Sequence, residues 1–393
     1  MRTMHGILAL GAIVAVAGCS GERETQATTP ASSAPAAATK PAADLAAKAK
    51  ACDAALGRAA EWLLAQQLDD GTFGKDAKIG KTGLVLSALL AARGTDAFRK
   101  EPRVKKALDF VVQGAQPDGS INSPGEKGLA NYQTSAALAA LAAFNDPAHA
   151  KIRKAAADFL VSIQNLPSPD DPNYGSWGYN RDKRGDLSNT QFTLEALKAA
   201  GLDENDEAFK RCRAFLERCQ NRSESSDQEF ATNDGGAMYY PGRSNAGVIA
   251  LPNGKVIYKS YGSMTYALLR AYVLCGLKPD DPRVRAAQKW ITENYTVAEN
   301  PGMDKGKELQ GLYYYYLSMA KALALLQVTT LKLPDGTEAN WAADLGDKLV
   351  SLQRPEGYWI NEAMRWMEND KVLCTAYAVL ALSECRDALA TSH

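Results

Sequence analysis

Polar side chains gather in one short segment of the chain, residues 186–191. The segment holds the carboxylate of Asp186, the hydroxyl of Ser188 and the amides of Asn189 and Gln191. A buried carboxyl group that is kept unionised can donate a proton, whereas a serine hydroxyl is far too weak an acid to do so. Asp186 also stands just before an apolar helical segment, where a side-chain oxygen would cap the first turn. We therefore expect a structural cap at Asp186 and keep it as a weak candidate for a catalytic residue.

Aromatic side chains stand at matching places before other apolar segments. Tyr132 and Tyr261 each begin one, and four consecutive tyrosines, residues 313–316, begin another. Aromatic rings can hold an apolar chain, stack on a sugar or stabilise a cation, although each single ring could equally belong to the core. Four consecutive positions cover the whole circumference of a helix, so at least one of these tyrosines should face a cavity. The candidate cavity residues are Tyr132, Gln133, Trp177, Asp186, Ser188, Asn189, Gln191, Tyr261, Tyr314, Tyr315 and Cys374.

Most of these candidates lie next to a motif that recurs six times. The motif is a threonine followed by an apolar residue four positions later, an alanine at six and a large apolar or aromatic residue at seven. Positions 0, 4 and 7 share one face of an α-helix, and the alanine suggests a close helix approach on another side. These segments are apolar nearly all round, which predicts buried inner helices. The copies start at Thr82, Thr134, Thr190, Thr265, Thr375 and, in a variant form, Tyr316.

A second set of helices is expected between these segments. Val104, Leu108 and Val111 form a one-sided apolar stripe with charged residues around it, which is typical of an outer helix. Six helix pairs of 50–75 residues cannot bury their faces singly, and the first and last pairs keep the apolar pattern where an open solenoid would need a polar cap. The sequence predicts an all-α domain over residues 50–393, an α6/α6 toroid with six inner and six outer helices. Acidic residues followed by proline mark several outer-helix starts, at Pro102, Pro147 and Pro282.

The turns between the two kinds of helix carry a resemblance to a known family. Residues 67–73 and 353–359 each run from a glutamine through a glycine to an aromatic residue. These turns resemble the Gln-Trp motifs of squalene-hopene and oxidosqualene cyclases. The doubled helices resemble the prenyltransferase and squalene-oxidase repeat, which protein prenyltransferase β subunits share. The resemblance covers all six repeats and implies a toroid most like the C-terminal type of the squalene-hopene cyclases.

The resemblance also identifies where the acid of a cyclase would stand. In class II triterpene cyclases an inner helix begins Asp-x-Asp-Asp-Thr, and the middle aspartate protonates the substrate. The matching run here has Asp186 and Thr190 in place, but the acid position is Ser188. The resemblance therefore implies the fold of a cyclase without its proton donor, and we expect that the chain is not a competent class II cyclase.

Two other toroid chemistries lack their residues. The zinc site of a protein prenyltransferase needs an aspartate, a cysteine and a histidine on inner helices. The histidines here are His5, His149 and His393, none of which falls on such a segment. The thioester string Gly-Cys-Gly-Glu-Gln of macroglobulin domains is also absent from the sequence. We expect no metal and no cofactor, while the non-covalent role of such domains, binding another protein, stays open.

The N-terminal segment predicts export and lipid attachment. Residues 6–17 form an uncharged apolar run that is too short to span a bilayer but suits a signal peptide. The run leads into Cys19 through small residues, an arrangement that resembles the bacterial lipobox. We predict a lipoprotein signal peptide over residues 1–18 and a lipid on Cys19. An Ala-, Pro-, Ser- and Thr-rich linker over residues 19–49 would then tether the toroid to the cell envelope, at the periplasm or the cell surface.

Composition limits the remaining partners. Lys plus Arg and Asp plus Glu balance at 45 each, and no basic block stands out, so nucleic acid is not an expected partner. We expect a monomer. Six cysteines besides Cys19 permit disulfides without prescribing them. Cys212 and Cys219 share one helical face and continue an apolar stripe, which predicts buried thiols.

Two hypotheses about function follow. The favoured one is a non-catalytic envelope module that binds an apolar, glycan or protein ligand in the central cavity. The alternative is an enzyme that acts in that cavity on a terpenoid or a polysaccharide. Ser188 at the acid position favours binding. The acidic pairs that begin at Asp69, Asp170 and Asp280 are better explained as turns and caps than as the carboxylates of a glycosidase.

Replacing Cys19 tests the lipid anchor. Cys19→Ser removes the thiol that would carry the lipid, so the variant should remain unprocessed or become soluble. Metabolic labelling with a fatty-acid probe measures the attachment, and Cys52→Ser, at a cysteine of the toroid, is the matched control. Continued labelling of the Cys19 variant would show that the predicted anchor is wrong.

Overall fold

The computed structural model of the chain describes residues 39–123, 125–126, 128–181 and 184–391. The expected signal peptide, Cys19 and the first part of the expected linker lie outside the described residues. Helix α1 (Thr39–Ala65) begins before the expected end of the linker at residue 49. Alanine and lysine are strong helix formers, so the composition of residues 39–49 suits a helix as well as a linker. Leu45 and Ala49 of this stretch already pack against the core.

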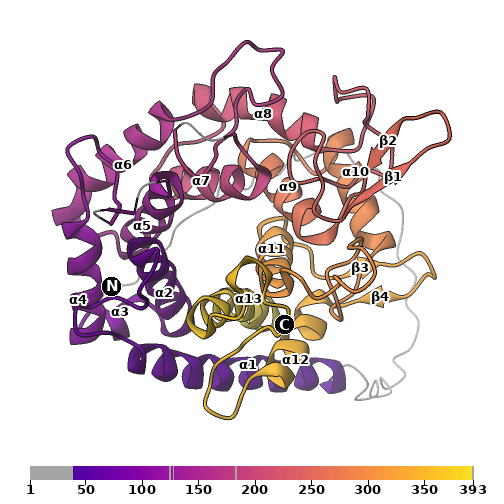
Figure 1. Cartoon of the computed structure of the whole chain (residues 1–393). Helices are drawn as coiled ribbons and strands as arrows, with labels where there is room; N and C mark the ends of the chain where they lie inside the picture. The colour runs from indigo at the N-terminus through magenta and orange to yellow at the C-terminus, as the bar shows by residue number, and fades with distance from the viewer. Residues whose placement is uncertain (1–38, 124, 127, 182–183, 392–393) are drawn as a thin grey trace, which may run out of the picture. The chain divides into compact units, whose positions relative to one another are not determined.

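Six helices that are apolar on nearly all sides form the inner layer of the unit that runs from Lys40 to His393 (Figure 1). All six copies of the repeated motif lie on them, as predicted. None of the helices in the described part of the chain is long and apolar enough to cross a membrane. The inner helices are α2 (Lys78–Arg93), α5 (Ala130–Phe144), α7 (Leu187–Ala199), α9 (Gly262–Leu274), α11 (Leu312–Leu325) and α13 (Lys371–Thr391).

Helices with a single apolar stripe surround this inner layer. On α4, for example, Val104, Ala107 and Val111 are buried while most of the other positions are exposed or half-buried. An acidic residue caps the helix that begins at Pro102, and another caps the helix that begins at Pro282. Pro147 begins the 3-10 turn η1 (Pro147–His149), which leads into α6. The outer helices are α1, α4 (Pro102–Gln113), α6 (Ala150–Ser162), α8 (Glu207–Cys219), α10 (Pro282–Glu293) and α12 (Trp341–Leu352).

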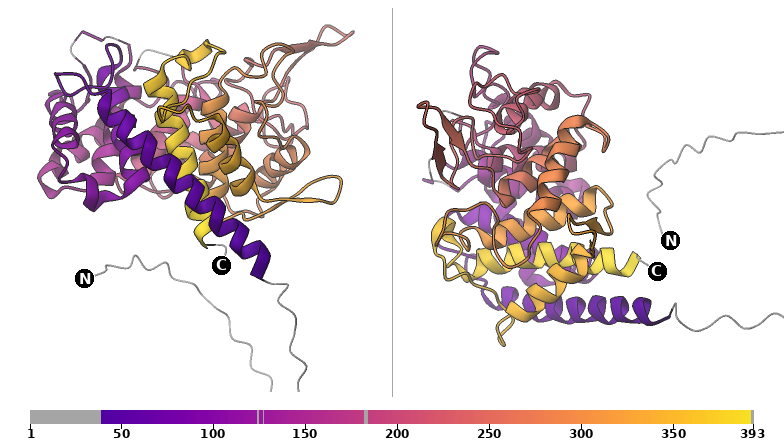
Figure 2. Two further views of the ribbon diagram at one scale, coloured as in Figure 1. Left: turned by 90° about the horizontal axis from the view of Figure 1, so that it is seen from below. Right: turned by 90° about the vertical axis from the view of Figure 1, so that its right-hand side faces the viewer.

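Two antiparallel hairpins are inserted into this ring of helices, one between α8 and α9 and the other between α11 and α12 (Figure 2). In the first, β1 (Val248–Ala250) pairs with β2 (Val256–Tyr258). In the second, β3 (Leu331–Lys332) pairs with β4 (Glu338–Ala339). The remaining elements are the short helix α3 (Thr95–Phe98) and the 3-10 turn η2 (Arg365–Met367).

In four of the six copies the repeated threonine ties the turn to the inner helix that follows it, whereas the Thr82 hydroxyl has no hydrogen-bond partner in the described structure. In the variant copy the longer side chain of Tyr316 also ties the turn to its inner helix, because its hydroxyl donates to the Val297 carbonyl at 2.8 Å. The motif found in the sequence is therefore a structural staple. In four copies the threonine hydroxyl accepts a backbone N–H of the turn at 2.9–3.1 Å: Ile121 to Thr134, Trp177 to Thr190, Ala237 to Thr265 and Trp359 to Thr375.

In four of the six helix pairs a glutamine in the turn joins the pair to the next outer helix. Its amide nitrogen donates both to the turn glycine and to a backbone carbonyl of that outer helix. The glycine packs so closely on the same helix that an added Cβ would lie 2.3–3.0 Å from another carbonyl oxygen. A side chain is excluded there, and the glycines also have positive φ. The glutamines and their outer-helix carbonyls are Gln67 with Arg103, Gln164 with Ala208, Gln220 with Arg283 and Gln353 with Ala55, at 2.8–2.9 Å.

The last of these joints closes the ring. Gln353 belongs to the sixth helix pair, and its partner Ala55 lies on α1, the outer helix of the first pair. The inner layer closes as well, since Lys81 of α2 pairs with Asp370, just before α13, at 2.7 Å. Arg386 of α13 donates to the carbonyls of Ala91 and Ala92 at the end of α2. The predicted toroid, in preference to an open solenoid, is confirmed.

The six described cysteines are buried free thiols. Cys212 and Cys219 are among them, as the apolar stripe of α8 predicted.

Removing the closing glutamine should destabilise the ring. Gln353→Ala deletes hydrogen bonds to the carbonyls of Ala55 and Gly357, which should lower the free energy of unfolding by about 2 kcal/mol. Gln116→Ala is the matched control, because the Gln116 amide bonds to Gly114 within its own turn. Chemical denaturation measures both variants. An equal loss in the two variants would contradict a special role for the closing joint.

Candidate functional site

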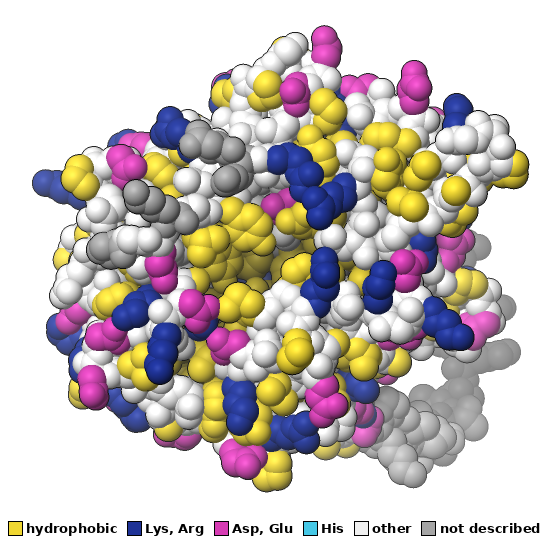
Figure 3. All heavy atoms as spheres, in the orientation of Figure 1, with side chains coloured by type: hydrophobic (Ala, Val, Ile, Leu, Met, Phe, Trp, Pro, Cys, Tyr) yellow, Lys and Arg dark blue, Asp and Glu magenta, His cyan; other side chains and the backbone are white. Residues whose placement is uncertain are grey.

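A cavity of about 210 Å³ opens at the end of the ring where the inner helices begin. Hydrophobic side chains line the hollow near the centre of this face (Figure 3). The residue two positions before the repeated threonine or tyrosine lines the cavity in five of the six copies. These five residues are Tyr132, Ser188, Ser263, Tyr314 and Leu373.

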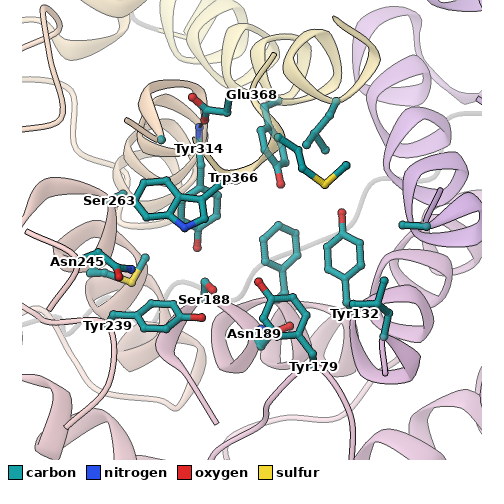
Figure 4. A pocket seen from close by; sticks show the side chains of 18 of the residues that line it. Tyr132, Tyr179, Ser188, Asn189, Tyr239, Asn245, Ser263, Tyr314, Trp366 and Glu368 are labelled. Atoms are coloured by element: carbon teal, nitrogen blue, oxygen red, sulfur yellow. Dashed lines mark hydrogen bonds between the residues drawn. The ribbon is translucent and has the colours of Figure 1, made fainter. Parts of the chain in front are cut away.

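Aromatic rings from four inner helices meet in this cavity (Figure 4). Phe192 of α7 lies between two tyrosines, with its ring centroid 6.3 Å from that of Tyr132 on α5 and 6.1 Å from that of Tyr314 on α11. Tyr314 in turn lies 6.1 Å from Tyr377 on α13. Ring contacts of this kind favour an apolar or cationic guest over a charged anion. The hydroxyl of Tyr314 is buried next to that of Ser318.

Asp186 caps α7 and lies behind the cavity wall. It is 2% exposed, and its carboxylate accepts the backbone N–H of Asn189 at 2.9 Å. The Ser188 hydroxyl donates to it at 2.6 Å, and the Asn189 side-chain amide donates at 2.8 Å. Burial raises the pKa of Asp186, whereas these hydrogen bonds lower it, and the net direction is upward. Asp186 does not line the cavity, whereas Ser188 and Asn189, which donate to it, do.

Glu368 is a second buried carboxyl group, and it does line the cavity. It is 1% exposed, and burial raises its pKa to about 7 against the hydrogen bonds that lower it. Its oxygens accept the Asn361 side-chain amide at 2.6 Å and the backbone N–H of Tyr314 at 2.9 Å. The α11 helix begins after Gly311, which has no side chain to cap it. Glu368 therefore supplies the missing cap from a distant loop.

The loop before Glu368 covers part of the cavity. Trp366 and Met367 line it, and both have left-handed backbones, with φ of 55° and 64°. Such conformations cost about 1–3 kcal/mol each. The Trp366 ring packs on Gly311, where an added Cβ would lie 3.0 Å from the ring. Trp366 is still 40% exposed, so its indole faces both the cavity and solvent.

An ion cluster of Glu195, Arg270 and Lys321 joins three inner helices. Glu195 of α7 pairs with Arg270 of α9 at 2.7 Å and with Lys321 of α11. Burial would raise the pKa of Glu195, but these two cations lower it to about 2. Glu195 is thus an ionised structural group and no proton donor. Across the described ranges no group of three or more His, Cys, Asp or Glu side chains could hold a metal ion.

Five of the candidate residues named from the sequence line the cavity, namely Tyr132, Ser188, Asn189, Tyr261 and Tyr314. They come from α5, α7, α11 and the residue before α9, so the structure brings the predicted helix starts together. Whether they bind a ligand stays a prediction.

The other six candidates point elsewhere. Asp186, as described above, accepts hydrogen bonds from Ser188 and Asn189 and does not line the cavity. Gln133 is turned toward the preceding loop, where it accepts from Ser123 at 3.1 Å, and Gln191 donates to Glu195 at 3.1 Å. The Tyr315 hydroxyl donates to the Thr296 carbonyl. Trp177 and Cys374 are fully buried in the core, and the Trp177 indole donates to the Leu160 carbonyl at 2.7 Å.

Glu368, Phe192 and Tyr377 also line the cavity, although they were not predicted from the sequence. Phe192 and Tyr377 stand two positions after the repeated threonine, so the same helical face could have identified them. Nothing in the sequence identifies Glu368, because it lies in a loop, where no repeating pattern of residues indicates which side chains face the cavity. Tyr239, Asn245 and Met367 reach the cavity from loops in the same way.

Comparison with known proteins agrees with the fold. Residues 76–241 match the family model of the squalene-hopene cyclase C-terminal domain. No curated protein gives a significant match to the chain.

Solved structures of type II terpene cyclases are similar over most of the chain. The apo form of the type II terpene cyclase MstE from Scytonema is 14% identical, with a TM-score of 0.55, and the match covers 86% of this chain and 99% of that one. A variant of the same cyclase in complex with its substrate, geranylgeranyl dihydroxybenzoate, is 14% identical, with a TM-score of 0.55 and coverage of 87% and 99%. A protein from Actinoplanes is 15% identical, with a TM-score of 0.51 and coverage of 86% and 99%. Identity at this level establishes the fold alone.

Glu368 should make the stability of the protein depend on pH. Its pKa is about 7 in the folded state against an ordinary value of 4.5, so the folded state holds more protons between these values. The contribution of Glu368 to stability should therefore be full below pH 4.5 and should fall by about 3 kcal/mol as the pH rises to 7. Denaturation across this range measures the effect.

Glu368→Gln should remove this component of the pH dependence. The baseline stability should fall as well, because Asn361 and Tyr314 donate to different oxygens of Glu368 and the glutamine amide replaces one of these acceptors by an NH2 group. Glu356→Gln, in an exposed turn, is the matched control. An unchanged pH profile in Glu368→Gln would contradict the assignment.

Proposed function

Starting from a toroid with the fold of the terpenoid cyclase and protein prenyltransferase superfamily, we propose that this chain binds an apolar, isoprenoid-type ligand in its cavity without cyclising it. The observation that carries the proposal is the aromatic lining. Phe192, Tyr132, Tyr314 and Tyr377 stand in contact, and Trp366 covers part of the cavity from the loop. Apolar side chains such as Leu129, Met264 and Leu373 complete the wall. An apolar chain would gain burial there at roughly 25 cal/mol per Å².

The acid position supports binding over cyclisation. Ser188 occupies that position, and its single proton is donated to Asp186. Each pKa unit by which a donor is too weak costs up to about 1.4 kcal/mol of barrier, and a serine hydroxyl lies many units beyond a carboxylic acid. Asp186 cannot replace it, because its oxygens accept hydrogen bonds behind the wall.

The similar structures support the ligand class. The complex of MstE holds geranylgeranyl dihydroxybenzoate, which carries a polyprenyl chain. The cavity of this chain belongs to a toroid of similar fold and is lined by aromatic rings, so it suits a related apolar chain. The proposal places this cavity at the bacterial envelope, tethered through a lipid on Cys19, where apolar ligands concentrate.

An enzymatic alternative rests on one observation, the Glu368 carboxyl group. It lines the cavity beside Trp366, and its pKa of about 7 keeps part of it protonated near neutral pH. Against this, Glu368 accepts hydrogen bonds from Asn361 and from the start of α11, which are contacts of a capping carboxylate.

Binding and conversion can be measured in one experiment. Titration with myrcene, a C10 isoprenoid hydrocarbon, should shift the tryptophan emission to the blue, because the ligand replaces water around the half-exposed Trp366. The shift should disappear in Trp366→Phe and persist in Trp359→Phe, since Trp359 is buried in the core and donates to Leu349.

Product analysis completes the test. The unmodified protein should give no cyclic product from squalene, oxidosqualene or geranylgeranyl dihydroxybenzoate. A cyclic product that is lost in Glu368→Gln would overturn the binding proposal in favour of the enzyme. Absence of any response to myrcene would also count against it.

A further inference from the structure

One side of the cavity presents two hydroxyl groups, those of Ser188 and Tyr239. Both residues line the cavity, and the Tyr239 phenol oxygen is directed toward Ser188 (Figure 4). Ser188 is on the first turn of α7, and Tyr239 comes from the loop between α8 and β1. We refer to this pair as the acceptor corner.

Asp186 takes the protons of both hydroxyl groups. The Ser188 hydroxyl donates to its carboxylate at 2.6 Å, and the Tyr239 hydroxyl also hydrogen-bonds it. A hydroxyl group has one proton and further lone pairs that can accept. Once the proton is committed to Asp186, each of these oxygens can only accept a further hydrogen bond. The Tyr239 oxygen has one partner in the hydroxyl of Tyr179, which also lines the cavity, whereas the Ser188 oxygen is left for the ligand. Asp186 thereby fixes the polarity of the corner without touching the cavity.

We propose that the acceptor corner binds a hydrogen-bond donor on the ligand, and that the ligand is an isoprenoid alcohol whose hydroxyl donates to Ser188 or Tyr239. The inference rests on the proposed function and specifies the ligand class for the same cavity. A hydrocarbon or an ether would bury the Ser188 oxygen without a donor and would give the Tyr239 oxygen none beyond Tyr179, which disfavours it relative to the alcohol.

A cationic donor such as an amine is less suited to the corner than an alcohol. Lys81 also lines the cavity and is 3% exposed. It is held as a cation by Asp76 and Asp370, at 3.0 and 2.7 Å. Its charge is balanced by these two carboxylates. An ammonium group would lose its hydration on entering this largely apolar cavity, a cost that a neutral hydroxyl avoids.

The sharpest test compares two ligands that differ only in the donor. Geraniol carries a hydroxyl group, and geranyl methyl ether has the same chain with the proton replaced by a methyl group. Calorimetric titration of the full chain should show geraniol binding about tenfold more tightly. Equal affinity, or a preference for the ether, would overturn the inference and leave the proposed function intact. Absence of binding by both would remove the proposed function as well.

Two variants test whether the preference for the alcohol over the ether comes from the acceptor corner. Tyr239→Phe deletes one acceptor and should weaken geraniol several-fold while leaving the ether unchanged. Tyr316→Phe is the matched control, because that hydroxyl donates to the Val297 carbonyl outside the cavity. A loss of equal size for both ligands in Tyr239→Phe would point to packing and overturn the hydrogen-bond assignment.

Asp186→Asn tests the source of the polarity. The amide accepts fewer hydrogen bonds than the carboxylate, so the Tyr239 or Ser188 hydroxyl should turn to donate into the cavity. The ratio of alcohol to ether affinity should then fall toward one. Asp281→Asn changes an equivalent cap on the outer helix α10 and should leave the ratio unchanged. If Asp186→Asn does not fold, as judged by circular dichroism, Tyr239→Phe and the ligand pair still decide the inference.

Discussion

The contact on which the rest of the structure depends is the joint between a turn glutamine and the backbone of the next outer helix. It repeats with the same two acceptors in four places, and the last copy joins Gln353 to Ala55. A glycine beside each glutamine lets the turn approach the helix more closely than any side chain permits. Because the sixth pair meets the first through the same contact, the inner helices surround a closed lumen. Their starts are then brought to one mouth, and the cavity lies there.

This arrangement explains why the polar groups at the cavity are capping groups. Helix starts present unpaired backbone N–H groups and a partial positive charge, so carboxylates are favoured near them. Asp186 caps α7, Asp370 caps α13 and Glu368 caps α11 from a loop. A ring of helix starts at one mouth therefore collects carboxylates for structural reasons. An acidic residue at this mouth is weak support for catalysis unless its protonation and its hydrogen-bond partners show that it can donate a proton.

The repeat made the fold predictable, because a period of four and seven reports one helical face wherever it occurs. The same period brings Tyr132, Ser188 and Tyr314 to the cavity, since each stands two residues before the repeated position. Gln133 and Tyr315 do not line it, because one further residue turns a side chain by about 100°. Trp177 does not line it either, because the turn aromatic packs into the core. Loop residues such as Glu368 and Tyr239 carry no period, so only the folded path of the chain could place them.

The chemistry of the cavity therefore turns on one side chain. An acid at position 188 would hold a proton that faces the ligand, whereas the serine found there directs its proton away from the ligand, to Asp186. The same carboxylate takes the proton of Tyr239. The wall at position 188 thus presents lone pairs to the cavity, beside the aromatic lining. A lumen of this polarity favours a ligand that brings its own proton, and it offers that ligand no acid at position 188 with which to start a cyclisation.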